Sequence, residues 1–511
     1  MLISRSTFAQ IACPPCAGGG FNTLCSPPPF GDAGFEKQWY IEPVRACEAW
    51  DLGFTGQGVV VGVCNWGILE THDDLAPQLE APEPAGCSEP RPNPPPPSWG
   101  EDSHGTWMAG IIAAAADTEN SLCSDIVGVA YGARLAEVFT WDGTGVTQTE
   151  MADSAVFNAD CIDIKATSYD ISGVTAHHAY MEPVLLDALA DAAETGRGGL
   201  GTVQVLAAGN QWTQAAPIRA DYDEFVSNRR VIAVGATALD NQRWTTPSNG
   251  SETGSCLLAC APGTDMFTAG RESSSSFAPS YSCVSGTSYA GPCVAGVVAL
   301  MLEANPGLSW RDVQEAIVRT AATIDDDPND PDDWQTNTAG LDHSYEYGHG
   351  LVDAYEAVSF VTGTNGYPAW TPLAAESVMT LDVAPKGVQV GPGQTRTILL
   401  QGDGGLRVEH VELTMDVTAT GAPGIGPLEI EVERLQLQQG DSPQPQVTRS
   451  VFAVARDDTS PSYDDGVFTS VRHWGEQSNA TWKVRLRNTS TQANPVTATW
   501  NNAELRLYGT E

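Results

Sequence analysis

The chain has 511 residues, 41% of them hydrophobic, so it can bury a sizeable core spread over roughly two to four domains. Its 64 acidic and 25 basic residues give a net charge of −39, which disfavours nucleic acids and anionic membranes as partners. The same charge favours cationic peptides, divalent cations and solubility in salt, and no run of 18 apolar residues predicts a membrane span.

Residues 1–37 are rich in Gly, Pro and Cys, and we expect them to be irregular. Their first 20 residues have no continuous apolar stretch, so no signal peptide is predicted. The 12 cysteines include no second pair at zinc-ligand spacing, which favours disulfides over a metal site. Disulfides suggest an oxidising compartment, and hence a secreted or extracytoplasmic protein.

Residues 38–360 alternate short apolar runs with helical stretches, which predicts an α/β domain whose parallel sheet has helices on both faces. The predicted buried strands are Val59–Cys64, Val203–Ala208 and Val231–Gly235, and the predicted helices are Thr106–Ala116 and Tyr289–Glu303.

The pattern changes at residues 361–375, which read as a linker. Residues 376–511 alternate apolar and polar positions, as in Glu409–Val417 and Leu428–Leu437, with turn residues between the runs. This periodicity predicts an all-β sandwich of about 135 residues.

Four polar residues stand where predicted strands end or predicted helices begin. Asn65 and Asn210 end strands, whereas His104 and Ser288 lie at the start of helices. A serine nucleophile needs an imidazole base, the base needs an orienting acceptor, and the oxyanion needs donors such as an asparagine amide. Each motif alone is commonly structural, but chance is a poor explanation for the whole set in this order.

The set resembles the subtilisin superfamily, whose order of acid, His and Ser it follows. Other segments are similar to the kexin/furin proprotein convertases: Gly196–Gly201, Trp310–Gln314, Asp333–Asn337, His343–Tyr345, Tyr347–Ala354, Val411–Thr414, Gly426–Ile430, His473–Glu476 and Leu507–Thr510. The resemblance implies a subtilisin-like catalytic domain, a C-terminal jelly-roll sandwich (the P domain), and a serine endopeptidase that forms an acyl-enzyme.

The sequence departs from that family at the triad acid, where Asn65 replaces Asp and Trp66 follows. In another serine protease this exchange costs about 10⁴ in turnover. The Asn is either an engineered change or a feature of an attenuated enzyme, and Asp102 is a weaker alternative acid. Two rival functions remain: a pseudoprotease that binds basic peptides or a partner without turnover, and a precursor that cuts only itself.

The resemblance also implies the substrate contacts. Asp223 matches the acid at the base of the first specificity pocket, and Ser168 and Gly209 match residues that contact the substrate. Cleavage after Arg or Lys is therefore expected. The acid of the second pocket has no clean counterpart, so dibasic preference stays open.

Further expectations by resemblance concern stability and folding. Asp32 and Asp74 match two ligands of a structural calcium ion, which prefers carboxylate oxygens. Cys123 and Cys283 match positions that form a disulfide in the family. The expected partners are a peptide or protein substrate and a folding chaperone or inhibitor protein.

Overall fold

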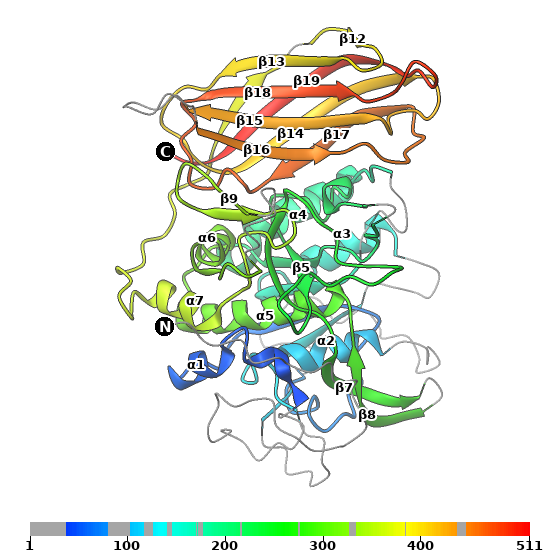
Figure 1. Ribbon diagram of the computed structural model, residues 1–511. Coiled ribbons are helices and arrows are strands. Elements are labelled where there is room, and N and C mark those ends of the chain that lie inside the picture. The colour runs from blue at the N-terminus through cyan, green and yellow to red at the C-terminus, as the bar shows by residue number, and fades with distance from the viewer. Residues whose placement is uncertain are drawn as a thin grey trace.

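A computed structural model describes residues 37–79, 103–116, 126–139, 146–169, 171, 177–214, 217–273, 276–325, 334–383, 385–436 and 446–511. An α/β body carries a β-sandwich on one side (Figure 1). The chain passes once from the body to the sandwich, between residues 362 and 377.

The body is built on a parallel sheet, as the apolar runs predicted, although they marked only three of its six strands. The six strands are β1 (Val60–Asn65), β2 (Arg134–Phe139), β3 (Ile164–Thr167), β4 (Val203–Ala207), β5 (Val231–Thr237) and β6 (Leu257–Pro262), in the order β2-β1-β3-β4-β5-β6. The strand order reverses between β1 and β3. In open α/β sheets the crevice at such a reversal is where ligands bind.

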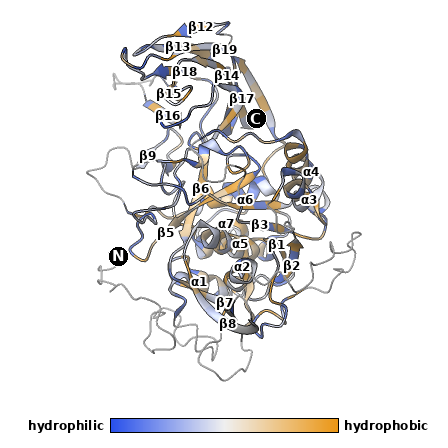
Figure 2. Ribbon diagram, turned by 90° about the vertical axis from the view of Figure 1, so that its right-hand side faces the viewer, coloured by the Kyte–Doolittle hydropathy of each residue, from blue (hydrophilic) through white to orange (hydrophobic). Residues whose placement is uncertain are grey.

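Helices cover both faces of this sheet, because alternate strand residues point to opposite sides. Val205 and Val234 pack in the cluster of α2 (His104–Ala113) and α5 (Thr287–Ala304). Leu206 and Ala233 pack in that of α3 (Gln148–Val156) and α4 (Pro183–Gly199). The remaining helices are α1 (Ala46–Asp51), α6 (Trp310–Thr320) and α7 (Ala354–Thr362). The central strands are correspondingly hydrophobic (Figure 2).

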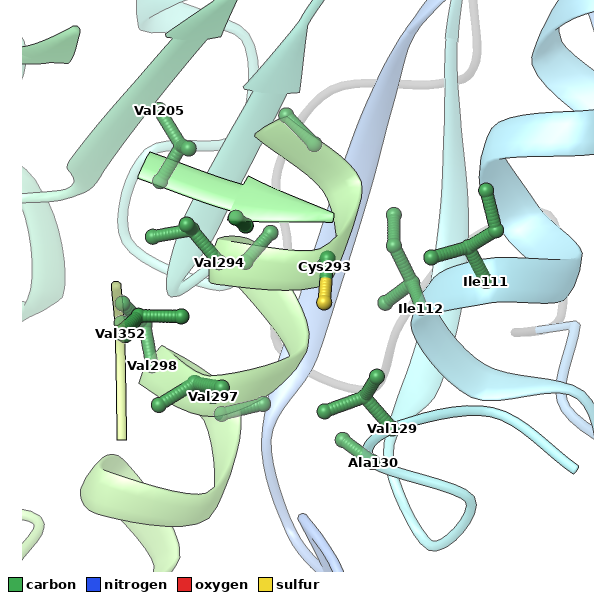
Figure 3. Close-up of a cluster of buried hydrophobic side chains, with 14 of the residues drawn as sticks. Ile111, Ile112, Val129, Ala130, Val205, Cys293, Val294, Val297, Val298 and Val352 are labelled. Carbon is green, nitrogen blue, oxygen red and sulfur yellow. The ribbon is translucent and has the colours of Figure 1, made fainter. Parts of the chain in front are cut away.

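Helix α5 is the centre of the larger cluster. Cys293, Val294, Val297 and Val298 of α5 lie among side chains of α2, of the segment before β2 and of β4 (Figure 3). Its length and hydropathy would also suit a membrane span, yet 83% of its residues are buried inside the protein, which is the pattern of a core helix.

The C-terminal part consists of two antiparallel sheets, as the alternating pattern predicted. One contains β11 (Ser377–Asp382), β19 (Thr497–Thr510), β14 (Arg407–Thr420) and β17 (Ser462–Ser470), with β12 (Val388–Val390) paired to β19. The other contains β13 (Thr395–Gln401), β18 (Thr481–Asn488), β15 (Leu428–Gln436) and β16 (Gln446–Ala453).

The body and the sandwich exchange side chains where they meet. Val471 and Trp474, which follow β17, belong to the core cluster of the body. Ile218 and Tyr222, which follow β4, belong to the core cluster of the sandwich. Since neither pair could be buried without the other unit, the junction is part of both cores.

Two short antiparallel pairs complete the body. They are β7 (Met266–Ser273) with β8 (Ser276–Val284), and β9 (Trp334–Thr336) with β10 (Asp342–Ser344).

Cysteine usage is mixed. Cys47, Cys161 and Cys283 are disulfide-bonded, whereas Cys64, Cys256, Cys260 and Cys293 are buried free thiols, so the expectation of disulfides does not extend to these four. Cys123 lies outside the described residues, and its pairing with Cys283 stays a prediction.

A neutral histidine, His343, forms polar contacts where the body meets the sandwich. The Arg472 guanidinium donates to Nδ1 of His343 at 2.8 Å, so the proton must be on Nε2, which lies 3.0 Å from the Leu257 carbonyl oxygen. Burial is the first cause that places the pKa of His343 well below its usual value, and the positive charge of Arg472 adds to it. The imidazole therefore stays neutral in the folded protein while it titrates normally in the unfolded chain.

We expect acid to weaken the fold through His343. Below pH 6.5 His343 is protonated in the unfolded chain but stays neutral in the folded protein. The contribution of His343 to the free energy of unfolding is therefore complete above that pH and falls as the pH is lowered. The loss from this residue is about 2 kcal/mol at pH 5. Urea unfolding at pH 7.5 and pH 5 measures it, with His343→Gln as a control that does not titrate. Equal pH dependence in both proteins would refute the assignment.

Candidate active site

The predicted site residues gather at the reversal of the strand order. Asn65 ends β1, Ser168 directly follows β3, and Asn210 lies three residues beyond β4. His104 is the first residue of α2 and Ser288 the second of α5. Parallel strands end at one edge of a sheet, which is why residues so far apart in sequence meet there.

Helix α2 begins at His104, two residues before the predicted start at Thr106. The close approach of Gly105 to β1 explains the difference: a Cβ on Gly105 would lie 2.3 Å from the Gly67 carbonyl oxygen and 3.3 Å from Asn65 Cβ. Only a glycine allows α2 to start against the end of β1, so tertiary packing overrides its poor helix propensity.

Ser288 is 9% exposed at the N-terminus of α5. Four residues later comes Pro292, which has no N–H to donate to the Ser288 carbonyl oxygen. The Ser168 hydroxyl donates to that oxygen instead, at 3.1 Å. Ser168, predicted to contact the substrate, thus supplies the donor that the Ser288 carbonyl oxygen lacks within α5.

The amide of Asn210 has a fixed orientation. Its Oδ1 accepts hydrogen bonds from the backbone N–H and from the hydroxyl of Thr287, both at 2.9 Å. A backbone N–H can only donate, so the oxygen of the amide must face Thr287 and Nδ2 must point away from it. Asn210 is therefore set as a donor beside the residue that precedes Ser288.

Gly209 completes this arrangement. Its N–H donates to the Thr287 hydroxyl at 3.3 Å, so that hydroxyl accepts from Gly209 and donates to Asn210. Gly209 has a φ of +109°, and a Cβ there would lie 2.5 Å from Oε1 of the buried Glu252. Any other residue would be strained at this φ and would have to displace the Glu252 carboxylate.

Three aromatic rings surround the His104 imidazole. The ring centroids of Tyr289, Trp66 and Trp107 lie 5.5, 6.1 and 6.2 Å from that of His104. Burial disfavours the charged form of the ring and lowers the pKa of His104 from 6.5 to about 4. His104 is therefore a neutral base at physiological pH.

The Asn65 amide is not bonded to His104. Its Nδ2 lies 3.5 Å from Sδ of Met108, and its Oδ1 accepts the Trp66 N–H at 3.0 Å. Among the residues that the structure describes, these are its side-chain hydrogen-bond partners. Asn65 occupies the predicted place at the end of β1, but its amide does not orient the imidazole. Asp102, the alternative acid, lies outside the described residues.

Asp223 is buried and contacts Ile171, three residues after Ser168. Its Oδ1 accepts from the N–H groups of Phe225 (2.9 Å) and Val226 (3.2 Å), and its Oδ2 accepts from Ile171 (2.9 Å). Such donors favour the ionised carboxylate and hold it rigidly. Asp223 is therefore a fixed negative charge near the site.

Of the two predicted calcium ligands, the structure describes Asp74. Asp74 is fully buried, and its Oδ2 accepts from the Tyr281 hydroxyl at 2.8 Å. Asp32 lies outside the described residues. Within the described ranges no three His, Cys, Asp or Glu side chains gather into a metal site. Asp74 thus offers one oxygen donor suited to calcium, and the rest of a site would have to come from elsewhere in the chain.

Sequence reasoning missed several members of the site. Thr287 was assigned no role, although it is hydrogen-bonded to both Gly209 and Asn210. Tyr289 and Trp107 carried no signal, because nothing in their spacing tells a core aromatic from one that faces a catalytic base. Nothing in the sequence indicated that the Glu252 side chain lies against Gly209.

Comparisons with known proteins agree with this geometry. The model of the subtilase family matches residues 56–350. The chain is 31% identical to furin of Bos taurus, over 94% of this chain and 58% of furin, and 26% identical to kexin of Saccharomyces cerevisiae, over 93% and 56%. It therefore spans less than two thirds of these relatives.

A solved structure extends the likeness to the whole chain. The serine protease of Aeromonas sobria, crystallised with a chaperone, superposes with a TM-score of 0.75 at 18% identity, covering 96% of this chain and 97% of that one. At this identity the likeness concerns the fold, which is subtilisin-like with C-terminal antiparallel sheets.

We expect the His104 imidazole to titrate near pH 4, because burial disfavours its charged form. NMR of the ring protons against pH measures this. The variant Asn65→Asp should titrate at a higher pH, since a carboxylate at that place favours imidazolium. A midpoint near 6.5 in the unmodified chain would show that the ring is hydrated.

Proposed function

The chain belongs to the subtilase family, on its kexin/furin side, and from that premise we propose that it is a serine endopeptidase. The observation that carries the proposal is the fixed Asn210 amide, which Thr287 orients beside Ser288 at the start of α5. A donor locked in this way suits charge that develops only during a reaction.

The proposed reaction is acyl transfer. Ser288 Oγ attacks the peptide carbonyl carbon while His104 takes the hydroxyl proton, and Asn210 Nδ2 donates to the oxyanion. His104 then gives the proton to the leaving nitrogen, the C–N bond breaks and an ester to Ser288 remains. Water attacks this ester by the same route, releasing the new carboxyl end and restoring Ser288.

Asn65 sets how well this machinery works. An amide bonded to Met108 and Trp66 neither orients the imidazole nor stabilises imidazolium, so we propose an attenuated enzyme. The same observation favours the rival function, a protein that binds peptides without cleaving them.

Basic peptides are the proposed substrates. Asp223 supports this, because three backbone N–H groups hold its carboxylate ionised and rigid, and a fixed buried anion selects a cationic side chain. The net charge of −39 would also attract such peptides at long range.

The wider setting belongs to the same proposal. We propose that the C-terminal sandwich is a P domain and that the protein works in a secretory or extracytoplasmic compartment. A folding chaperone is a proposed partner, since the solved Aeromonas sobria protease was crystallised with one.

We expect Asn65→Asp to raise the hydrolysis of an Arg-ending fluorogenic peptide by about 10³–10⁴, because a carboxylate restores orientation and charge. Labelling by a serine-directed fluorophosphonate should rise in parallel, and Ser288→Ala should do neither. If Asn65→Asp neither labels nor cleaves any basic peptide, the cleft serves binding and the endopeptidase proposal is wrong. Shortening of the purified chain alone, seen on a gel and absent in Ser288→Ala, would indicate a self-processing precursor.

Calcium should stabilise the protein if Asp74 is a ligand. We expect EDTA to lower the melting temperature and added calcium to restore it, and Asp74→Asn should remove this response. Differential scanning calorimetry measures all three. A melting temperature that ignores EDTA would remove calcium from the proposal.

A further inference from the structure

The segment that carries Asp223 is held from both sides by the C-terminal sandwich. On one side the hydroxyl of Tyr222 accepts the Val454 N–H at 3.2 Å, and the Arg456 guanidinium lies 4.1 Å from the Tyr222 ring centre. On the other side Oε1 of Glu224 accepts the N–H of Val467, in β17, at 2.9 Å. Asp223 thus lies between two residues that are bonded to the sandwich.

Glu224 ties three segments together. Besides Val467, its Oε1 accepts from Nε2 of His178 at 2.9 Å, and its Oε2 accepts the Met181 N–H at 2.8 Å. The carboxylate can only accept, so His178 must carry its proton on Nε2. Glu224 is 8% exposed and His178 is 6% exposed, so loss of any of these bonds would leave a buried polar group unpaired.

Residues 177–181 form the third segment, and they too contact both units. The Ala179 N–H donates to the Tyr222 carbonyl oxygen at 2.7 Å, and the Glu224 N–H donates to the Ala179 carbonyl oxygen at 3.1 Å, so Asp223 is paired as in a strand. The Tyr180 hydroxyl accepts the Asp464 N–H at 2.9 Å.

The fit of His178 against the sandwich is close. Its ring lies 4.8 Å from that of Phe468, and a Cβ on Gly466 would lie 3.1 Å from His178 Nε2. The sandwich therefore contacts His178 in two ways. Gly466 has no side chain and allows a close approach, and Phe468 packs its ring against the imidazole.

We infer that the C-terminal sandwich is part of the specificity site, and that Glu224 and His178 are the positioning residues through which it fixes Asp223. Asp223 takes two of its side-chain donors, the N–H groups of Phe225 and Val226, and its backbone pairing with Ala179 from segments that these two residues join. This inference rests on the proposed preference for basic residues.

The test is binding, which does not depend on the turnover that Asn65 limits. Two fluorescein-labelled peptides that differ only in a terminal Arg or norleucine are titrated against the full chain, and anisotropy gives the ratio of their affinities. The variants are Glu224→Gln, Asp223→Asn and Glu409→Gln. Glu409 is the matched control, a buried junction carboxylate that instead bonds Arg311 of α6 at 2.7 and 2.8 Å.

We expect Asp223→Asn to lower the preference for Arg at least about 30-fold, since it removes the paired charge. Glu224→Gln should lower it about 3- to 10-fold, because its NH₂ would face a backbone N–H and loosen the segment. Glu409→Gln should lower the melting temperature with little change in the ratio. An unchanged ratio in Glu224→Gln, or an equal fall in Glu409→Gln, would overturn the inference. An unchanged ratio in Asp223→Asn would instead reject the proposed specificity.

Discussion

The burial of α5 is the constraint on which the site depends. This helix packs against β3, β4 and α2 over its whole length, so the place of its first turn is decided by the core. Ser288 and Thr287 stand in that turn, and Thr287 in turn fixes Gly209 and Asn210. Thr287 therefore holds Asn210, the proposed oxyanion donor, next to Ser288, the proposed nucleophile.

Against this rigid part, the acid position stands out. Asn65 lies at the end of a buried strand and next to the start of α2, yet its amide is hydrogen-bonded to Met108 and Trp66. The rings of Trp66, Trp107 and Tyr289 lie around the imidazole, and burial lowers its pKa, so the ring is neutral at physiological pH.

The sandwich is more than an appended domain in this chain. The two cores exchange Trp474 and Tyr222, and the polar contacts at the junction are buried and charged, as for Arg311 with Glu409. Because an unpaired buried charge strongly destabilises the folded state, we expect the body and the sandwich to unfold together. This coupling reaches the 222–224 segment, which carries Asp223, the proposed specificity residue.

The sequence alone determined the two architectures and the main chemical groups. Apolar runs marked strands because parallel strands are buried on both faces. Polar residues at strand ends marked Asn65 and Asn210, and those at helix starts marked His104 and Ser288. Only the tertiary structure decided the start of α2, the direction of the Asn65 amide, the aromatic enclosure of His104 and the hold of Val467 on Glu224. Those features depend on contacts between residues up to 243 positions apart, and no local pattern encodes which distant side chain a given atom will meet.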